Sequence, residues 1–218
     1  MTKTDLKHIN CEGISVTYSD QTNGAGLETR FDFLNAVKRI FPNRKFKHCY
    51  EWCCGPGFFG YSLLGAEICE ALFLADYFAP ALEQARQTAT TNQLLNRVEI
   101  VQSKSWENIS CAEKKFDLII GNPPHFCLQN YYNELWTFEK RIYIDENWQT
   151  HRDFFAGVKN YLAPDGEILL MECAWGSGIN VFAQMIDAGG LKIINHFIGD
   201  YWHDKLGFPV YYLHLRHK

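Results

Sequence analysis

Residues 46–60 read FKHCYEWCCGPGFFG. The apolar run over Phe46–Cys53 predicts a buried β-strand, and the glycines that follow it predict a tight turn leading into a helix over Phe58–Leu64. Glycine lets the backbone approach a ligand closely, and the first turn of a helix presents free N–H groups. The segment therefore predicts a strand–turn–helix unit with a nucleotide-like ligand at the turn, although a glycine-rich turn alone also fits an ordinary connection.

Downstream of this unit, apolar strand patterns alternate with helical patterns. We expect further strands at residues 71–75, 98–101, 116–121, 167–174, 191–198 and 210–215, and helices at 80–96, 148–162 and 179–188. Such alternation is typical of an α/β fold with a Rossmann-like, doubly wound, mostly parallel sheet of seven strands. Because ligands of such sheets bind beyond the carboxyl ends of the strands, the informative residues should follow strands directly.

The segment before the first of these strands is short. Residues 13–18 alternate as a strand, Asn23–Gly26 has turn composition, and residues 31–41 have helical spacing up to Pro42. We therefore divide the chain into an N-terminal strand and helix extension, residues 1–45, and a ligand-binding domain, residues 46–218.

The composition limits the class of protein. The chain has 218 residues, of which 47% are hydrophobic, and a formal net charge of -4 from 21 Lys and Arg against 25 Asp and Glu. That apolar fraction excludes a disordered or fibrous chain. The mild acidity argues against a protein that binds duplex nucleic acid through bulk charge.

Cysteines and termini bear on the compartment. The eight cysteines form no C-x-x-C pair, and most lie in apolar runs, where cysteine acts as a small hydrophobe. Residues 1–10 are polar, and no apolar run reaches the about 18 residues of a membrane span. We expect a cytoplasmic protein with reduced thiols, no membrane contact and no metal site.

Two further positions follow strands directly. Asp76 ends the expected strand at 71–75, about 20 residues past the turn, where an acid can accept hydrogen bonds from ribose hydroxyls or can cap a helix. The ring of Tyr77 could lie against a purine or be a partly buried loop aromatic.

The strand at 116–121 runs into Gly121-Asn122-Pro123-Pro124-His125-Phe126. Two prolines stiffen this loop and leave carbonyl oxygens without local N–H partners. The side-chain oxygen of Asn122 and the carbonyl of Pro123 can then both accept hydrogen bonds from one NH2 group, and the ring of His125 can stack on a planar group. A plain turn is the alternative for this segment.

Taken in order, Glu51–Gly60, Asp76 and Asn122–His125 resemble the motifs of class I S-adenosylmethionine-dependent methyltransferases, of the methyltransferase small domain group. The Asn-Pro-Pro-ring motif is similar to that of the amino-methylating branch, which includes protein-glutamine N5-methyltransferases. The resemblance covers about residues 46–198, and it implies an antiparallel last strand in the sheet and S-adenosyl-L-methionine as cofactor.

The resemblance also implies roles for individual residues. Glu51 would contact the methionine end of the cofactor, Asp76 the ribose hydroxyls, and Tyr77 the adenine ring. Asn122 and Pro123 would hold the acceptor nitrogen in line with the methyl group for direct transfer, which rests on proximity and orientation. The remaining cofactor contacts would come from the backbone at Cys53, Gly55 and Gly57 and, at the adenine edge, from Ser105 and Trp106.

The sequence departs from the family pattern at three of these positions. Cys53 stands in place of the usual glycine, and Ser105 in place of an Asp that commonly contacts the adenine amine. His125 stands in place of Tyr or Phe, and an imidazole can donate or accept a proton. We include His125 with Asn122 and Pro123 as candidate catalytic residues.

The acceptor is less defined by the sequence than the cofactor. Residues 126–155 are rich in aromatics and suit either an acceptor pocket or a small core. The polar residues Asp145, Asn147, His151 and Arg152 could contact an acceptor or equally serve as helix-cap and surface residues. The acidic balance disfavours RNA, so we expect a small-molecule or peptide acceptor, with nucleobase methylation as the alternative. Two alternative functions belong to other classes of protein: a cofactor-binding partner subunit without activity, and a dehydrogenase. The oligomeric state is not predicted.

Overall fold

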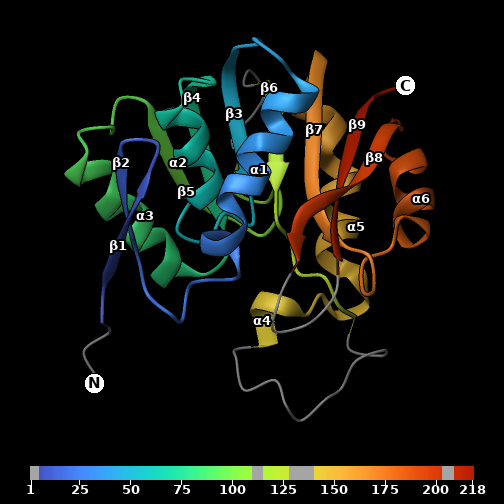
Figure 1. Ribbon diagram of the computed structural model, residues 1–218. Helices are drawn as coiled ribbons and strands as arrows, with labels where there is room; N and C mark the ends of the chain where they lie inside the picture. Colours follow the sequence, from blue (N-terminus) through green and yellow to red (C-terminus); the bar gives the residue numbers. More distant parts are fainter. Residues whose placement is uncertain (1–4, 110–114, 128–139, 203–208) are drawn as a thin grey trace.

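A computed structural model describes residues 5–109, 115–127, 140–202 and 209–218 of the chain (Figure 1). In these residues a seven-stranded sheet has the strand order β5-β4-β3-β6-β7-β9-β8. Its strands are β3 (Phe46–Trp52), β4 (Cys69–Asp76), β5 (Val98–Gln102), β6 (Phe116–Gly121), β7 (Leu162–Cys173), β8 (Leu191–Trp202) and β9 (Pro209–His217). The neighbours from β5 to β7 pair in parallel, and β9 is antiparallel to both β7 and β8. The predicted α/β, Rossmann-like sheet with an antiparallel last strand is confirmed.

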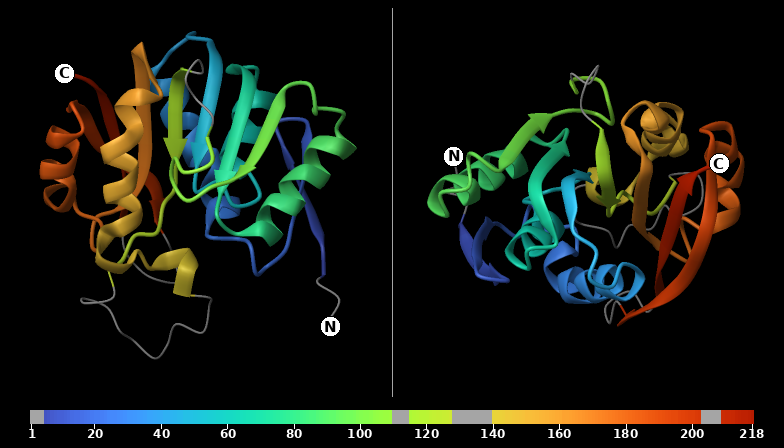
Figure 2. Two further views of the ribbon diagram at one scale, coloured as in Figure 1. Left: turned by 180° about the vertical axis from the view of Figure 1, so that it is seen from behind. Right: turned by 90° about the horizontal axis from the view of Figure 1, so that it is seen from above.

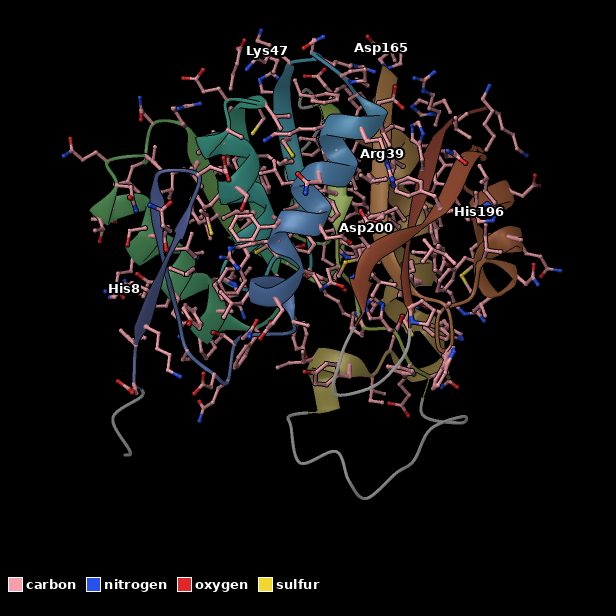
Figure 3. All side chains as sticks on the ribbon, viewed as in Figure 1. His8, Arg39, Lys47, Asp165, His196 and Asp200 are labelled. Atoms are coloured by element: carbon pink, nitrogen blue, oxygen red, sulfur yellow. The ribbon has the colours of Figure 1, made fainter. Side chains whose placement is uncertain are left out.

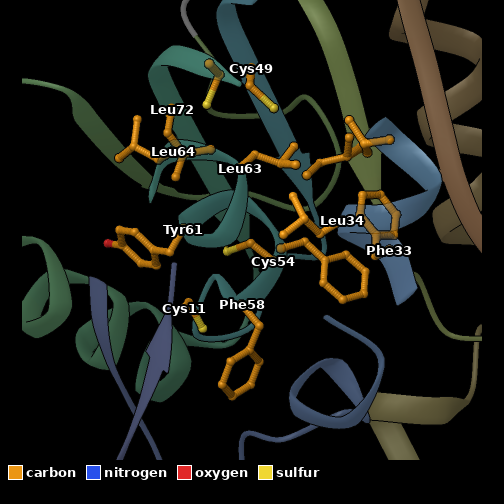
Figure 4. Close-up of a cluster of buried hydrophobic side chains, with 14 of the residues drawn as sticks. Cys11, Phe33, Leu34, Cys49, Cys54, Phe58, Tyr61, Leu63, Leu64 and Leu72 are labelled. Carbon is orange, nitrogen blue, oxygen red and sulfur yellow. The ribbon is translucent and has the colours of Figure 1, made fainter. Parts of the chain in front are cut away.

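Helices cover both faces of this sheet (Figure 2). Helices α1 (Gly26–Ile40), α2 (Phe58–Gly65) and α3 (Ala79–Thr91) contribute to one buried cluster, which Figure 4 shows in part. Helices α5 (Gln149–Gly157) and α6 (Ile179–Ala188) contribute to the other. Successive side chains of a strand point to opposite faces, so Ile119 packs in the second cluster and Ile120 in the first. This two-sided burial explains why the strands read as continuous apolar runs.

The chain order places a switch point between β3 and β6. The chain runs outward from β3 to β4 and β5, and then returns to β6 on the other side of β3. The helices after β3 and β6 therefore leave to opposite sides, and the carboxyl ends of these two strands frame a natural ligand site. Lys47 and Asp165, labelled in Figure 3, lie toward the opposite ends of the strands.

The N-terminal residues add a hairpin of β1 (Lys7–Cys11) and β2 (Ile14–Tyr18), where the sequence predicted one strand. The hairpin packs beside α3, and the backbone N–H of Thr17 donates to Thr88 Oγ1 across 2.9 Å. Val16 of β2 and Phe33 of α1 are fully buried in the first cluster. Residues 5–45 therefore share a core with the rest of the described chain.

Other differences from the predicted elements lie in residues 140–167. A short helix α4 (Lys140–Tyr143) precedes two 3-10 turns, Glu146–Trp148 and Val158–Asn160, that flank α5 in place of one helix over 148–162. Asn147 and Trp148 have positive φ values of 55° and 56°, which interrupts a continuous helix there. Residues 163–166, which separate the expected helix from the expected strand at 167–174, lie inside β7, where the pairing with β6 shifts register between Phe116 and Leu118.

The described residues contain free cysteines and short helices. All seven cysteines in the described residues are free, and six of them are buried. Cys111 lies outside the described residues. Among the helices of the described part, none is long and apolar enough to cross a membrane.

Candidate functional site

Glu51 lies at the carboxyl end of β3, with 3% of its surface exposed. Its Oε2 accepts a hydrogen bond from the backbone N–H of Gly60 across 2.7 Å. A Cβ at position 60 would lie 2.6 Å from that oxygen, so only glycine allows this helix to approach the carboxylate. Burial raises the pKa of Glu51 to about 8, against the lowering effect of the N–H groups of Gly60 and Phe59. The carboxyl group is therefore placed where a cationic group would favour its charged form.

The turn after β3 contains three left-handed residues. Cys53, Gly55 and Gly57 have φ values of 53°, 51° and 89°. A Cβ at Gly57 would lie 2.9 Å from the ring of Tyr61, so glycine is required there for packing as well as for φ. Of these three residues only Cys53 has a side chain, and a side chain makes this backbone conformation strained.

Replacing Cys53 with glycine therefore tests the strain in the turn. We expect Cys53→Gly to change the free energy of unfolding by between about 0 and +1 kcal/mol, because relief of left-handed strain offsets the entropy of the added glycine. Cys53→Val should lower it by about 2 kcal/mol, since a β-branched residue fits this region worst. Chemical denaturation measures both, and a glycine variant less stable than the valine variant would contradict the argument.

Asp76 ends β4 beside this turn. Its Oδ2 accepts from the N–H of Gly55 and its Oδ1 from the N–H of Phe78, each across 2.9 Å. The carboxylate thus joins the glycine turn to the start of α3. The sequence allowed Asp76 to be either a helix cap or a ribose ligand, and the same carboxylate can serve in both roles. Tyr77, next in the chain, is 46% exposed.

A pocket opens over the carboxyl ends of β3, β4 and β6, and encloses about 690 Å³ including the space at its mouth. Six residues singled out in the sequence line it: Glu51, Cys53, Gly55, Asp76, Tyr77 and Asn122. The N-terminal segment also reaches it, through Thr22, Gly24 and Gly26. The sequence placed Gly24 and Gly26 in a turn but did not assign Thr22 to the site, since a single threonine in a polar stretch carries no signal.

A second, adjoining pocket encloses about 430 Å³ including its mouth. It is lined by Asn122, Pro123 and His125 together with Ile142 and Tyr143. Asn122 lines both pockets and so stands between them. Its Nδ2 donates to the carbonyl of Gly24 across 3.3 Å, whereas its buried Oδ1 has no hydrogen-bond partner within the described chain. A buried acceptor without a partner is costly, so this oxygen is suited to a donor from a ligand.

His125 faces a buried carboxylate. Its Nδ1 lies 3.4 Å from Glu172 Oε2 and 3.4 Å from Ser177 Oγ. Glu172 is fully buried near the end of β7. Glu172 is not among the residues predicted from the sequence. Its position as a lone acid in the apolar run ILLMEC, residues 168–173, could have indicated a buried functional carboxylate.

Comparison with known proteins now decides the family. The model of the family "Methyltransferase small domain" matches residues 30–139. The chain belongs to this family. This family is one of class I S-adenosylmethionine-dependent methyltransferases, whose cofactor is S-adenosylmethionine.

The curated relatives of this methyltransferase are longer proteins. A "Bifunctional methyltransferase" of Rickettsia felis is 30% identical over 135 residues, which cover 59% of this chain and 25% of the relative. One from Rickettsia bellii is 26% identical over 143 residues, 63% of this chain and 25% of the relative. The match therefore spans about a quarter of these relatives.

Solved structures share the fold of the methyltransferase. M. jannaschii TYW2 in complex with AdoMet superposes with a TM-score of 0.60 at 14% identity, covering 100% of this chain and 89% of that one. The ribosomal protein L11 methylase from Lactobacillus delbrueckii subsp. bulgaricus gives 0.57 at 12% identity, covering 88% and 79%. At these identities the likeness concerns the fold alone.

The first pocket of the methyltransferase fits its cofactor chemically. S-adenosylmethionine carries a cationic sulfonium, an amino group and ribose hydroxyls, and the pocket offers the carboxyl groups of Glu51 and Asp76. The buried Glu51 supports this fit most directly, because its carboxyl group lines the pocket and a cation beside it would favour its charged form.

Three predicted cofactor residues, Gly57, Ser105 and Trp106, do not line the pocket, although Gly57 belongs to the turn beside it. Ser105 and Trp106 are buried. The ring of Trp106 stacks on Tyr50, Phe154 and Tyr161 in the second core cluster, and its Nε1 donates to the carbonyl of Phe154. Ser105 Oγ donates to the carbonyl of Thr150. The structure therefore does not bring Ser105 and Trp106 together with the other candidates, and a contact to adenine stays a prediction.

Proposed function

We propose that this methyltransferase transfers a methyl group to an amino or amide nitrogen of a small molecule or a peptide, as the amino-methylating branch with the Asn-Pro-Pro-ring motif does. The observation that carries the proposal is Asn122 Oδ1, a buried acceptor between the two pockets that has no hydrogen-bond partner among the described residues. An NH2 group has the donors that this oxygen requires, and Pro123 lines the second pocket together with Asn122.

The first pocket would hold the cofactor. Glu51 and the glycine turn would bind its methionine end, Asp76 its ribose hydroxyls, and Tyr77 would lie against its adenine. Bound S-adenosylmethionine supplies an electrophilic methyl group on sulfur. Asn122 would orient the acceptor nitrogen toward the first pocket, and the prolines would keep the loop from adjusting, so that the entropic cost of alignment is met by the folded protein.

The lining of the second pocket supports an acceptor without phosphates. Among the described residues that line it, none is Lys or Arg, and Glu172 lies behind His125. Nucleic-acid binding depends on cations that neutralise phosphates, so this lining favours a small molecule or peptide over RNA.

A screen for the acceptor tests the proposal. The protein is incubated with S-adenosylmethionine labelled in its methyl group and with peptide, RNA and small-molecule fractions of a cell extract. We expect label in the small-molecule or peptide fraction as an N-methyl group that survives mild base, which hydrolyses methyl esters. Label in RNA alone would overturn the choice of acceptor, label on oxygen or carbon would overturn nitrogen as the target, and absence of transfer despite cofactor binding would favour a partner subunit without activity.

The ionisation of Glu51 gives a prediction for cofactor binding. The pKa of about 8 leaves most of this group protonated at pH 7 in the free protein, and a cationic amino group beside it favours the carboxylate. Binding of S-adenosylhomocysteine at pH 7 should therefore release close to one proton per site. Calorimetry in buffers of different ionisation enthalpy measures this number.

Two variants frame the proton count. Glu51→Gln should release close to no proton, whereas the exposed Glu107→Gln should behave as the native protein. In the native protein, the folded pKa lies above the unfolded one, so the contribution of Glu51 to stability is present at low pH and is lost as pH rises toward 8. Glu51→Gln should accordingly gain stability relative to the native protein between pH 5 and pH 8. Proton release that persists in Glu51→Gln would show that another group loses the proton.

A further inference from the structure

His125 lines the second pocket, and one nitrogen of its ring contacts the protein. Its Nδ1 contacts Glu172 Oε2 and Ser177 Oγ, and its side chain is 12% exposed. Its Nε2, on the opposite edge of the ring, makes no hydrogen bond to the described chain. Ser177 Oγ donates to the carbonyl of Cys173, so both partners of Nδ1 are left to act as acceptors. This arrangement places the proton of a neutral ring on Nδ1 and a lone pair on Nε2.

Glu172 is itself fixed by a second histidine. Its Oε1 lies 3.2 Å from His151 Nε2, and His151 Nδ1 lies 2.6 Å from Asp145 Oδ2. Asp145 also accepts from the backbone N–H groups of Thr150 and His151 at the start of α5. Asp145, His151, Glu172 and His125 therefore form a hydrogen-bonded series that runs from a buried helix start to the pocket. The first three members of this series have at most 2% of their surface exposed.

The charges of the buried members of this series follow from their contacts. Both nitrogens of His151 face carboxylate oxygens, so both carry protons. Burial alone would lower the pKa of His151, but the charge of Glu172 and the bonds to both carboxylates raise it to about 9. Burial would raise the pKa of Glu172, but the charge and bonds of the two histidines lower it. Two carboxylates and one imidazolium leave a net negative charge behind His125, and Tyr143 is the other titratable residue of the described pocket lining.

We propose that His125 accepts the proton that the acceptor nitrogen loses, and that Glu172, His151 and Asp145 are positioning residues that keep Nε2 bare for it. The inference rests on the proposed N-methyl transfer. The lone pair of the acceptor nitrogen forms the new N–C bond, the C–S bond breaks with its electron pair on sulfur, and the proton passes from nitrogen to Nε2. The imidazolium of His125 then releases this proton to solvent.

Nitrogen-15 NMR of the histidine rings tests the proposal without an acceptor. In the native protein with S-adenosylhomocysteine, we expect the neutral ring of His125 to carry its proton on Nδ1. Glu172→Gln should lower the ratio of the Nδ1–H to the Nε2–H tautomer by about tenfold, the effect of replacing a charged hydrogen-bond partner with a neutral one. A native ring with its proton on Nε2, or protonated on both nitrogens from pH 6 to pH 9, would overturn the proposal.

A carboxylate on the same strand provides a matched control. Glu167 is also fully buried in β7 and bonds to His214 and Arg216, about 17 Å from Glu172 along the strand. Glu167→Gln should destabilise the protein and leave the His125 tautomer unchanged. Equal tautomer shifts in both variants would show a general structural effect and contradict the positioning role.

A ring without a proton acceptor tests the catalytic step. With the extract fraction that takes up label, His125→Phe should lower kcat about 100-fold or more and leave the Kd of S-adenosylhomocysteine within threefold. An unchanged kcat would show that the ring only stacks and would overturn proton transfer to His125. Label found on oxygen or carbon would overturn the proposed N-methyl transfer instead. The tautomer measured by nitrogen-15 NMR would then be the sole test of the positioning of His125 by Glu172.

Discussion

Asn122→Ala should lower kcat for methyl transfer by about 100-fold or more while the protein stays folded and binds S-adenosylhomocysteine with a Kd within threefold of the native value. The side-chain oxygen of Asn122 has no partner in the described chain, so its loss removes no native hydrogen bond to that atom. What disappears is the acceptor that would orient the substrate nitrogen, and a single positioned hydrogen bond of this kind contributes about two to three orders of magnitude to rate.

An isosteric variant separates hydrogen bonding from volume. Asn122→Asp loses the Nδ2 donor to the carbonyl of Gly24 and adds a negative charge, but it keeps an oxygen that accepts from an NH2 group, so its kcat should stay within about tenfold of the native value. Asn96→Ala, at an exposed asparagine of the α3–β5 connection, controls for the loss of an amide side chain. Single-turnover measurements on the labelled fraction give these rates. A native rate in Asn122→Ala would show that the Asn-Pro-Pro loop does not hold the acceptor.

The parts of the molecule that the sequence predicted best share a physical basis. β3, β4 and β6 are buried on both faces, so their apolar runs are long and end sharply at the polar residues Glu51, Asp76 and Asn122. Since parallel strands present their carboxyl ends at one edge, these three residues meet in one pocket, as the sequence indicated.

The failures have an equally physical cause. Trp106 lies shortly after β5, but its ring stacks on Tyr50 and Tyr161 in the core. The order of residues in a sequence does not distinguish a ring that faces a pocket from one that packs below it. Glu172 is hidden in an apolar run, and its partner His151 lies 21 residues earlier on a helix. Such pairs depend on how a helix packs across a strand, which residue spacing does not encode.

Asp76→Asn should weaken S-adenosylhomocysteine binding by about 30-fold or more, since a carboxylate that accepts from two ribose hydroxyls loses charge on both bonds, each worth about 1.5–3 kcal/mol. Asparagine keeps the size of the side chain and one acceptor oxygen, so part of its bonding to the N–H groups of Gly55 and Phe78 survives. Isothermal titration calorimetry gives the Kd, and thermal denaturation shows whether the turn stays folded.

A ligand analogue assigns this loss to the ribose rather than to the turn. Because Asp76 also bonds the N–H of Gly55, a weaker Kd in Asp76→Asn could come from a displaced glycine turn. S-adenosylhomocysteine that lacks the 2′-hydroxyl removes the ribose partner and leaves the turn untouched. If Asp76 binds the ribose, removing this hydroxyl should cost the native protein about tenfold in Kd and cost Asp76→Asn much less, because the two changes remove the same interaction. Equal losses in both proteins would mean that Asp76 acts on the cofactor only by holding the turn.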